Sequence, residues 1–294
     1  MTSSPSSQFG DAPYLGVVDP RLLMGSGDKD VPWYNPTFPG LTKDQEDLLA
    51  NYSYHKPEVI APHIVAIRDR AWDIHSLPCI GQFRFIDLSL SRLPSYSHVV
   101  NLLKAGGRLL DLGCCFGQDL RKLVHDGAPA SSLFGAELRE EFIELGYELF
   151  LDKDKIGVNF LRADVFDPDS SLKELDGQLD VVHVGLFLHL FGWEGQRKAC
   201  ERIVGLLKPE KGVLILGQQV GCLMACDVKF EGERKVTRHD LVSFDRLWDE
   251  VGKATGTEWL VRAKLDEGLG VGDGKRVWDS PETRRLVFEV ERVS

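Results

Sequence analysis

Short apolar runs alternate with helical patterns from about residue 106 onward, and this alternation constrains the fold more than any other feature. Five of the runs have the length and the leucine and valine content of buried strands. They span residues 108–111, 132–137, 158–162, 179–184 and 212–217. Helical patterns separate them, for example over residues 118–125. Parallel strands need such crossovers, so the pattern predicts a doubly wound α/β fold with a mostly parallel sheet.

The C-terminal part adds two more predicted strands to this sheet, which brings it to seven. They lie near residues 259–265 and 285–290, and a glycine-rich loop through Gly268 and Gly274 joins them. Residues 237–240, Thr-Arg-His-Asp, resemble a capping box and predict that a helix follows them.

The N-terminal part has a different composition. Residues 1–13 are rich in serine, proline and glycine, which predicts a disordered tail. Prolines and aromatics then favour an extended segment up to about residue 39, and helical patterns begin at Thr42 and at Pro57. We therefore predict an extended segment and a helical substrate cap over residues 14–100, followed by an α/β domain over residues 101–294.

Charge and composition exclude several classes of function. The chain has 35 Lys and Arg against 45 Asp and Glu, a net charge of −10, which argues against nucleic acid as a partner. No apolar run approaches the roughly 18–20 residues of a membrane span, and the N-terminus lacks the pattern of a secretory signal. The six cysteines form no CxxC pair and no zinc spacing. We expect a soluble, cytoplasmic protein without a metal site.

Acidic residues stand at the ends of the first three strands. Asp111 opens the loop Asp-Leu-Gly-Cys-Cys-Phe-Gly, Glu137 ends the second strand, and Asp164 follows the third. Ligands of parallel sheets bind beyond the carboxyl ends of the strands, so these three acids should face one ligand. Gly113 and Gly117 let the loop turn sharply and approach that ligand closely.

Such an acidic cluster would repel a pyrophosphate and suits a cationic ligand that carries an adenosine. Glu137 can accept both ribose hydroxyls, and Asp164 can accept the adenine amine. Asp111 can meet the amino group of an amino-acid tail, directly or through water, and Gln118 at the start of the next helix can reach the same tail.

The loop Asp-x-Gly-x-x-x-Gly, the acid after the second strand and the Asp-Val pair after the third resemble the class I S-adenosylmethionine (SAM) methyltransferases. The resemblance covers roughly residues 100–292 and implies a Rossmann-like fold with SAM as cofactor and S-adenosylhomocysteine as product. Cys115 stands where glycine is usual, which narrows the room for the methionine tail. The residues that the resemblance assigns to the cofactor are Asp111, Gly113, Cys114, Gly117, Gln118, Glu137, Leu138, Asp164 and Val165.

A narrower resemblance covers nearly the whole chain. Residues 78–85 (Pro-Cys-Ile-Gly-Gln-Phe-Arg-Phe), 111–119 and 187–193 (Phe-Leu-His-Leu-Phe-Gly-Trp) look like fungal secondary-metabolite methyltransferases of the andrastin and austinol type. Those meroterpenoid-pathway enzymes methylate a carboxylic acid to its methyl ester. The resemblance therefore implies a hydrophobic small-molecule acid as the methyl acceptor.

The acceptor decides whether a base is needed. A carboxylic acid with a pKa near 4 is ionised at pH 7, whereas a phenol or an alcohol must lose a proton to a base. His189 lies about five residues past the fourth strand and is the catalytic candidate, either as a base or as a group that orients a carboxylate. A partly buried histidine bonded to backbone is the alternative, and His183 inside the strand is expected to be structural.

Three further residues are candidates for acceptor binding. Arg84, between two phenylalanines, could hold a carboxylate in its guanidinium fork or pair with a surface acid. Gln218 follows the fifth strand, and His55 lies in the cap. Methylation of a phenol or hydroxyl remains an alternative function, and so does a non-catalytic SAM-binding partner protein. Apolar patches on the cap could pair two chains into a homodimer.

Overall fold

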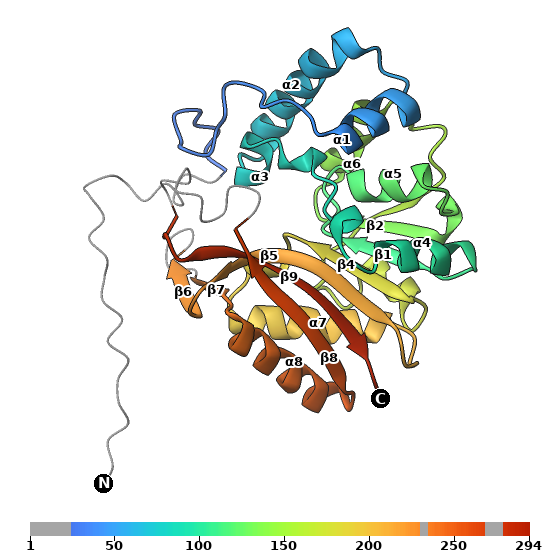
Figure 1. Ribbon diagram of the computed structural model, residues 1–294, viewed down its shortest axis with the longest axis vertical. Helices are drawn as coiled ribbons and strands as arrows, with labels where there is room; N and C mark the ends of the chain where they lie inside the picture. Colours follow the sequence, from blue (N-terminus) through green and yellow to red (C-terminus); the bar gives the residue numbers. More distant parts are fainter. Residues whose placement is uncertain (1–24, 230–234, 268–278) are drawn as a thin grey trace.

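The computed structural model describes residues 25–229, 235–267 and 279–294, and within them a seven-stranded sheet forms the centre (Figure 1). Its strand order is β3-β2-β1-β4-β5-β9-β8. The neighbouring pairs among the first five strands of that order are parallel, whereas β9 is antiparallel to both β5 and β8. The predicted doubly wound, mostly parallel sheet is confirmed. The strands are β1 (Leu109–Leu112), β2 (Leu133–Glu137), β3 (Asn159–Arg162), β4 (Val181–Gly185), β5 (Leu214–Cys222), β8 (Trp259–Asp266) and β9 (Thr283–Arg292).

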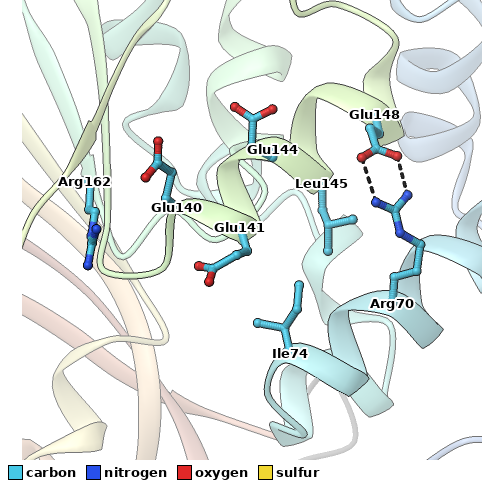
Figure 2. A pocket seen from close by; sticks show the side chains of 8 residues that line it. All are labelled: Arg70, Ile74, Glu140, Glu141, Glu144, Leu145, Glu148 and Arg162. Carbon is cyan, nitrogen blue, oxygen red and sulfur yellow. Dashed lines mark hydrogen bonds and ion pairs between the residues drawn. The ribbon is translucent and has the colours of Figure 1, made fainter.

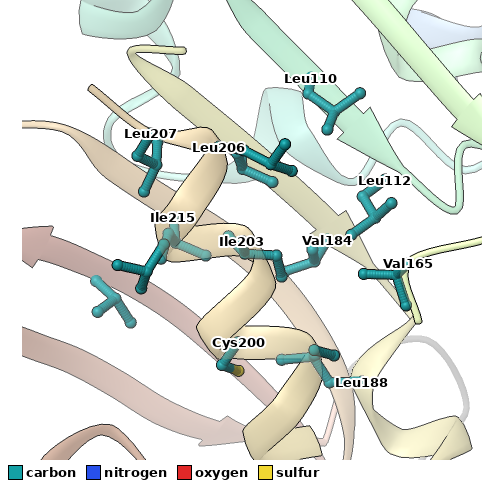
Figure 3. Packing of buried hydrophobic residues seen from close by; sticks show 14 of the residues in the cluster. Leu110, Leu112, Val165, Val184, Leu188, Cys200, Ile203, Leu206, Leu207 and Ile215 are labelled. Carbon is teal, nitrogen blue, oxygen red and sulfur yellow. The ribbon is translucent and has the colours of Figure 1, made fainter. Parts of the chain in front are cut away.

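Helices cover both faces of this sheet (Figure 1). One face carries α4 (Tyr96–Lys104), α5 (Gln118–His125) and α6 (Glu140–Phe150). The other carries α7 (Trp193–Leu206) and α8 (Leu241–Thr255). Figure 3 shows α7 packing Ile203 and Leu206 against the strands. Every residue of β1 is buried, as expected for a central parallel strand with both faces covered.

A helical region precedes the sheet in the chain and lies over α5 and α6 (Figure 1). The side chain of Thr42 caps its first helix in a capping box with Gln45, and four apolar residues of α2 that the spacing predicted, Ile60, Ile64, Ile67 and Ala71, are buried. Its elements are α1 (Lys43–Asp47), the π-helical turn η2 (Leu48–Tyr52), α2 (Pro57–Ile74), α3 (Pro78–Gly81), η3 (Arg84–Ile86) and η4 (Leu90–Arg92). The short turns η5 (Ala130–Ser132), η6 (Ser171–Leu175) and η7 (Leu188–Leu190) lie in later loops.

The hydrophobic core of this region extends into the α/β part of the chain. Trp33, Ile64 and Phe85 belong to the same buried cluster as Phe116 and Phe142. The ring of Phe116 lies 4.7 Å from that of Phe85 and 5.6 Å from that of Phe142, measured between centroids. Because Phe116 belongs to the loop after β1, the helical region packs directly on that loop.

The structure differs from the sequence-based prediction after β5. This strand continues to Cys222, beyond the predicted end at residue 217, and an unpredicted hairpin follows, with β6 (Cys226–Lys229) and β7 (Lys235–Arg238). The predicted capping box at residues 237–240 is wrong. Thr237 lies in β7 and donates its hydroxyl to Asp227 across the hairpin, while Asp240 caps α8 together with Ser243. The β-branched pair of residues 236 and 237 favours a strand.

Two predicted segments, the tail of residues 1–13 and the glycine-rich loop of residues 268–274, lie outside the described residues. In the part of the chain that the structure describes, no helix is both long enough and apolar enough to cross a membrane.

Candidate functional site

The loop after β1 depends on two glycines. Gly113 and Gly117 have φ angles of +73° and +67°, in the left-handed region that side chains disfavour. A Cβ atom on Gly113 would lie 2.7 Å from the ring of Phe187, and one on Gly117 would lie 2.8 Å from Nη1 of Arg121. The amides of Gly113 and Cys114 both donate to the carbonyl of Ala136, at 2.8 and 3.1 Å. The loop is therefore held against the carboxyl end of β2.

Glu137 at the end of β2 also binds this loop. Its Oε2 accepts the amide of Cys115 at 3.1 Å, and its Oε1 accepts the amide of Arg139 at the same distance. Burial raises the pKa of Glu137, and these hydrogen bonds oppose the rise. Each carboxylate oxygen has a second lone pair, so the side chain can still accept hydroxyl groups of a ligand.

Exposed apolar side chains flank the acids at the ends of β2 and β3. Leu138 is 57% exposed and Phe166 is 43% exposed, whereas Val165 is buried. Asp164 is exposed, and its Oδ1 accepts the amide of Phe166 at 2.9 Å. A flat apolar ring bound here would remove both side chains from water, which the hydrophobic effect favours.

Asp111 belongs to a buried polar network under the loop. Its Oδ1 lies 2.7 Å from Nδ1 of His183, and Nε2 of His183 lies 3.4 Å from the hydroxyl of Ser89. That hydroxyl donates to Asp119 on α5 at 3.0 Å, and the amide of Leu90 donates to the same carboxylate. Burial lowers the pKa of His183, but Asp111 and Asp119 outweigh it and the net pKa is raised. Burial raises the pKa of Asp119 to about 6.

Gln118 is the first residue of α5, directly after the loop. Its Oε1 is buried and, among the described residues, accepts no hydrogen bond. A buried polar atom without a partner costs about 1–3 kcal/mol, so a ligand donor at this position would be favourable. A buried acceptor, two strand-end acids and two exposed apolar side chains fit the ammonium group, the ribose and the adenine of SAM.

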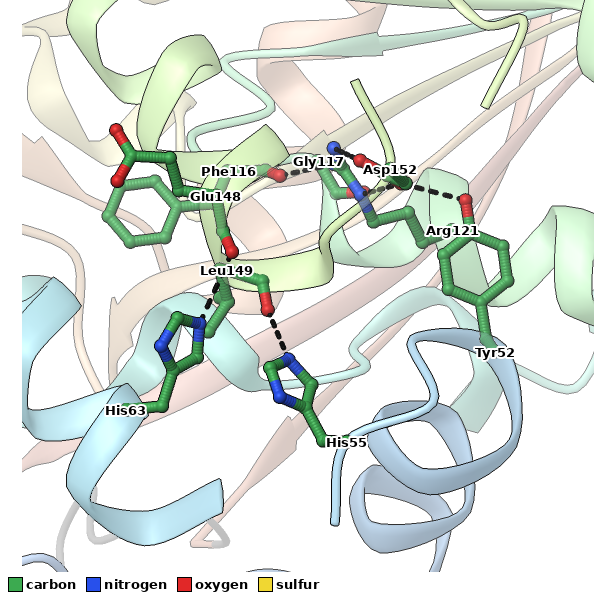
Figure 4. Close-up of polar contacts among 9 residues, drawn as sticks. All are labelled: Tyr52, His55, His63, Phe116, Gly117, Arg121, Glu148, Leu149 and Asp152. Carbon is green, nitrogen blue, oxygen red and sulfur yellow. Dashed lines mark hydrogen bonds and ion pairs between the residues drawn. The ribbon is translucent and has the colours of Figure 1, made fainter. Parts of the chain in front are cut away.

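The remaining predicted residues lie in two places. Gln218 is buried in β5, where its carbonyl accepts the amide of Leu186, and His189 lies in η7 after β4, so both lie near the carboxyl edge of the sheet. Arg84 in η3 donates its Nε to Gln82. His55 lies apart from them, because its Nε2 contacts the carbonyl of Leu149 at the C-terminal end of α6 (Figure 4).

Comparisons with known proteins point to one family. Residues 33–86 match the meroterpenoid methyltransferase N-terminal domain, and residues 109–210 match a methyltransferase domain. The O-methyltransferase atr3 of Stereocaulon alpinum is 44% identical over 95% of this chain and 81% of its own length. The O-methyltransferase phiE of a fungal species is 37% identical over 95% of this chain and 98% of its own length. The methyltransferase adrK of Penicillium roqueforti is 40% identical over 87% of this chain and 89% of its own length.

The chain belongs to this family of SAM-dependent O-methyltransferases. Among solved structures, the chain is similar to a 1,6-didemethyltoxoflavin N1-methyltransferase of Burkholderia thailandensis with bound S-adenosylhomocysteine. It is 15% identical, with a TM-score of 0.47 over 88% of this chain and 94% of that one.

A group of arginines at the seam between the helical region and the sheet of this methyltransferase was not predicted as a group. Arg84 of η3, the exposed Arg92 of η4 and Arg285 of β9 all lie within electrostatic range of Asp87. Burial lowers the pKa of Arg84, and Asp87 opposes this effect. Burial raises the pKa of Asp87, and the three arginines oppose it.

Arg285 has an incomplete set of hydrogen bonds. Its Nη2 donates to Asp266, but its Nε is buried and, in the part of the chain that the structure describes, has no acceptor. Arg285 lies opposite Val220 in the β5–β9 ladder, so it shares a sheet face with Gln218, two residues earlier on β5. Arg285 could not be identified from the sequence, because a charged residue at the start of a strand does not indicate which groups its side chain contacts.

A surface cavity of about 500 Å³ lies between α2 and α6, and its lining does not include these arginines (Figure 2). Four glutamates of α6 line it, and an ion pair between Arg70 and Glu148 lies at one end. Its acidic lining would repel an acidic acceptor, so we do not assign the methyl acceptor to it.

Proposed function

We propose that this methyltransferase converts a hydrophobic carboxylic acid, of the kind made in meroterpenoid pathways, into its methyl ester. SAM supplies an electrophilic methyl group on its sulfonium. An acid with a pKa near 4 is already a carboxylate at pH 7, so the protein needs to align the acceptor and exclude water rather than remove a proton.

The observation that carries this proposal is the positive charge at the arginine seam. Among the contacts of the described residues there, three arginines (Arg84, Arg92 and Arg285) stand against two aspartates (Asp87 and Asp266), so positive charge predominates. Partly buried guanidinium groups that repel one another are costly unless an anion joins them. A carboxylate of the acceptor would supply that anion and would accept a hydrogen bond from the Nε–H of Arg285, which has no acceptor among the described residues.

The other residues have roles that follow from their positions. Glu137 and Asp164 would bind the adenosine between the exposed side chains of Leu138 and Phe166. The glycine loop and Gln118 would bind the methionine end. The helical region would cover the acceptor as a cap, where the buried rings of Phe83 and Phe85 flank Arg84. His189 and Gln218 would orient the carboxylate through hydrogen bonds.

Methylation of a phenol or hydroxyl is the second candidate. It is favoured by the position of His189, a partly buried histidine in the turn that follows β4 at the carboxyl edge. In that reaction His189 would act as the base.

The experiment that decides between them uses acceptor pairs that share one terpenoid scaffold and carry either a free acid or only hydroxyls. Mass spectrometry should find a new methyl group only on the acids, and mild alkali should remove it. An alkali-stable methyl on the hydroxyl compounds would establish the ether-forming reaction instead. Binding of SAM without turnover of either series would contradict both and indicate a non-catalytic protein.

Arg285→Gln tests the seam itself. Loss of a charged hydrogen bond should raise the KM for the acid about 10- to 100-fold and leave SAM affinity unchanged. The matched control is Arg262→Gln on the neighbouring strand, an exposed arginine paired with Glu291. Equal KM values for the two variants would remove Arg285 from the acceptor site.

A further inference from the structure

Arg121 on α5 is fully buried and makes a two-pronged ion pair with Asp152, which follows α6 (Figure 4). Its Nε lies 2.7 Å from Oδ2 of Asp152 and its Nη2 lies 2.9 Å from Oδ1. The hydroxyl of Tyr52 donates to the same Oδ2 at 2.8 Å. Tyr52 belongs to η2 in the helical region, so this region supplies one of the three hydrogen bonds that Asp152 accepts from side chains of the described residues.

The other end of the same guanidinium binds the loop after β1, residues 113–117, which we call the cofactor loop. Nη1 of Arg121 donates to the carbonyl of Phe116 at 2.6 Å and to that of Gly117 at 3.2 Å. These residues end the loop, and Gly117 caps α5 in the left-handed conformation. One buried cation therefore joins the cofactor loop to an aspartate that the cap also binds.

A buried ion pair depends strongly on its full set of hydrogen bonds, because neither charge has water to replace a lost partner. Without the Tyr52 hydroxyl, Asp152 keeps Arg121 as its one side-chain donor among the residues that the structure describes. The guanidinium would then shift toward the carboxylate and away from the two loop carbonyls, which lie on its opposite side (Figure 4).

We propose that Tyr52 is a positioning residue for SAM binding, acting through Asp152 and Arg121 on the carbonyls of Phe116 and Gly117. The cofactor loop thus takes its binding geometry only when the cap is docked. The proposal concerns the cofactor alone, so it stands or falls independently of which acceptor is methylated.

The chain offers two controls. Tyr34 is a second tyrosine of the helical region, but its hydroxyl donates to Asp69 of the same region at 3.1 Å. His63 docks α2 on the C-terminal end of α6 through the carbonyl of Glu148, without contact to the Arg121 pair (Figure 4). Tyr34→Phe therefore controls for the loss of a hydroxyl, and His63→Gln for weaker docking.

The test is calorimetric binding of SAM to the full chain, without acceptor, together with the melting temperature. Tyr52→Phe should weaken SAM binding about 3- to 10-fold, as expected for one hydrogen bond to a charged network, while Tyr34→Phe and His63→Gln bind as the wild type does. Unchanged affinity in Tyr52→Phe, or the same loss in all three variants, would overturn the proposal.

Hydrogen exchange gives a second readout that a merely structural tyrosine would not move. In the SAM-free protein, amides of residues 113–118 should exchange faster in Tyr52→Phe than in Tyr34→Phe, with α8 unchanged in both. Equal exchange of the loop in the two variants would show that Tyr52 does not act on it.

Discussion

The carboxylate of Asp111 lies 2.7 Å from Nδ1 of His183, and both side chains are buried beneath the cofactor loop. The two residues are partners in the β1–β4 register, so their side chains leave the sheet side by side on one face. Oδ1 of Asp111 is therefore already hydrogen-bonded to His183. Any contact of Asp111 with the amino group of SAM would use its other oxygen or a bridging water.

The contribution of this pair to the stability of the folded protein should depend on pH. Burial opposes the charge on His183, but Asp111 and Asp119 outweigh it, so its folded-state pKa lies above the ordinary 6.5. The stabilisation is therefore complete below pH 6.5 and is lost as the pH rises through the raised folded-state pKa. His183→Gln should flatten the fall in melting temperature over that range. His98→Gln, at an exposed site on α4, should keep it, and equal slopes for the two variants would contradict the assignment.

Glu137→Ala should weaken SAM binding by about 1.5–3 kcal/mol, because it removes the charged hydrogen bonds proposed for the ribose and the one that Glu137 accepts from the amide of Cys115. Isothermal titration calorimetry measures this loss directly. Glu141→Ala, an exposed glutamate on α6, is the control and should bind as the wild type does. Unchanged affinity in Glu137→Ala would exclude Glu137 as the ribose ligand.

Two helical glycines should respond to alanine in opposite directions. A Cβ on Gly146 would lie 2.4 Å from the carbonyl oxygen of Phe116, so Gly146→Ala should cost about 1–3 kcal/mol of unfolding free energy. On Gly205 the nearest atom is Nη1 of Arg202 at 3.5 Å, and alanine there should stabilise by about 0.5–1 kcal/mol. Urea denaturation distinguishes the two. An unchanged free energy of unfolding in Gly146→Ala would mean that the loop containing Phe116 can move away from α6.

His189→Gln separates the two acceptor chemistries by rate. With a carboxylate acceptor no proton is removed, so kcat should stay within about tenfold of the wild type and should not fall steeply below about pH 6.5. With a hydroxyl acceptor the loss should reach about 10²- to 10⁴-fold. The measurement is kcat against pH for each member of the acceptor pairs.

Much of the fold could be predicted because its signals are local. Helix α5 begins and ends at the predicted residues, Gln118 and His125, and the predicted strands overlap β1 to β5. The loop glycines could be identified because a tight turn needs their backbone freedom. The β6–β7 hairpin could not, since four-residue strands carry too little periodicity to stand out.

The sequence by itself determined the alternation of strands and helices, the glycine loop and the acids at the strand ends. Periodicity and backbone freedom are properties of neighbouring residues, so they can be read without a fold. Only the tertiary structure decided that Asp111 meets His183, that Tyr52 reaches Asp152 across 100 residues, and that Arg285 joins Arg84 at the seam. Those partners depend on the order of strands in the sheet and on how the helical region packs over it, which no local pattern records.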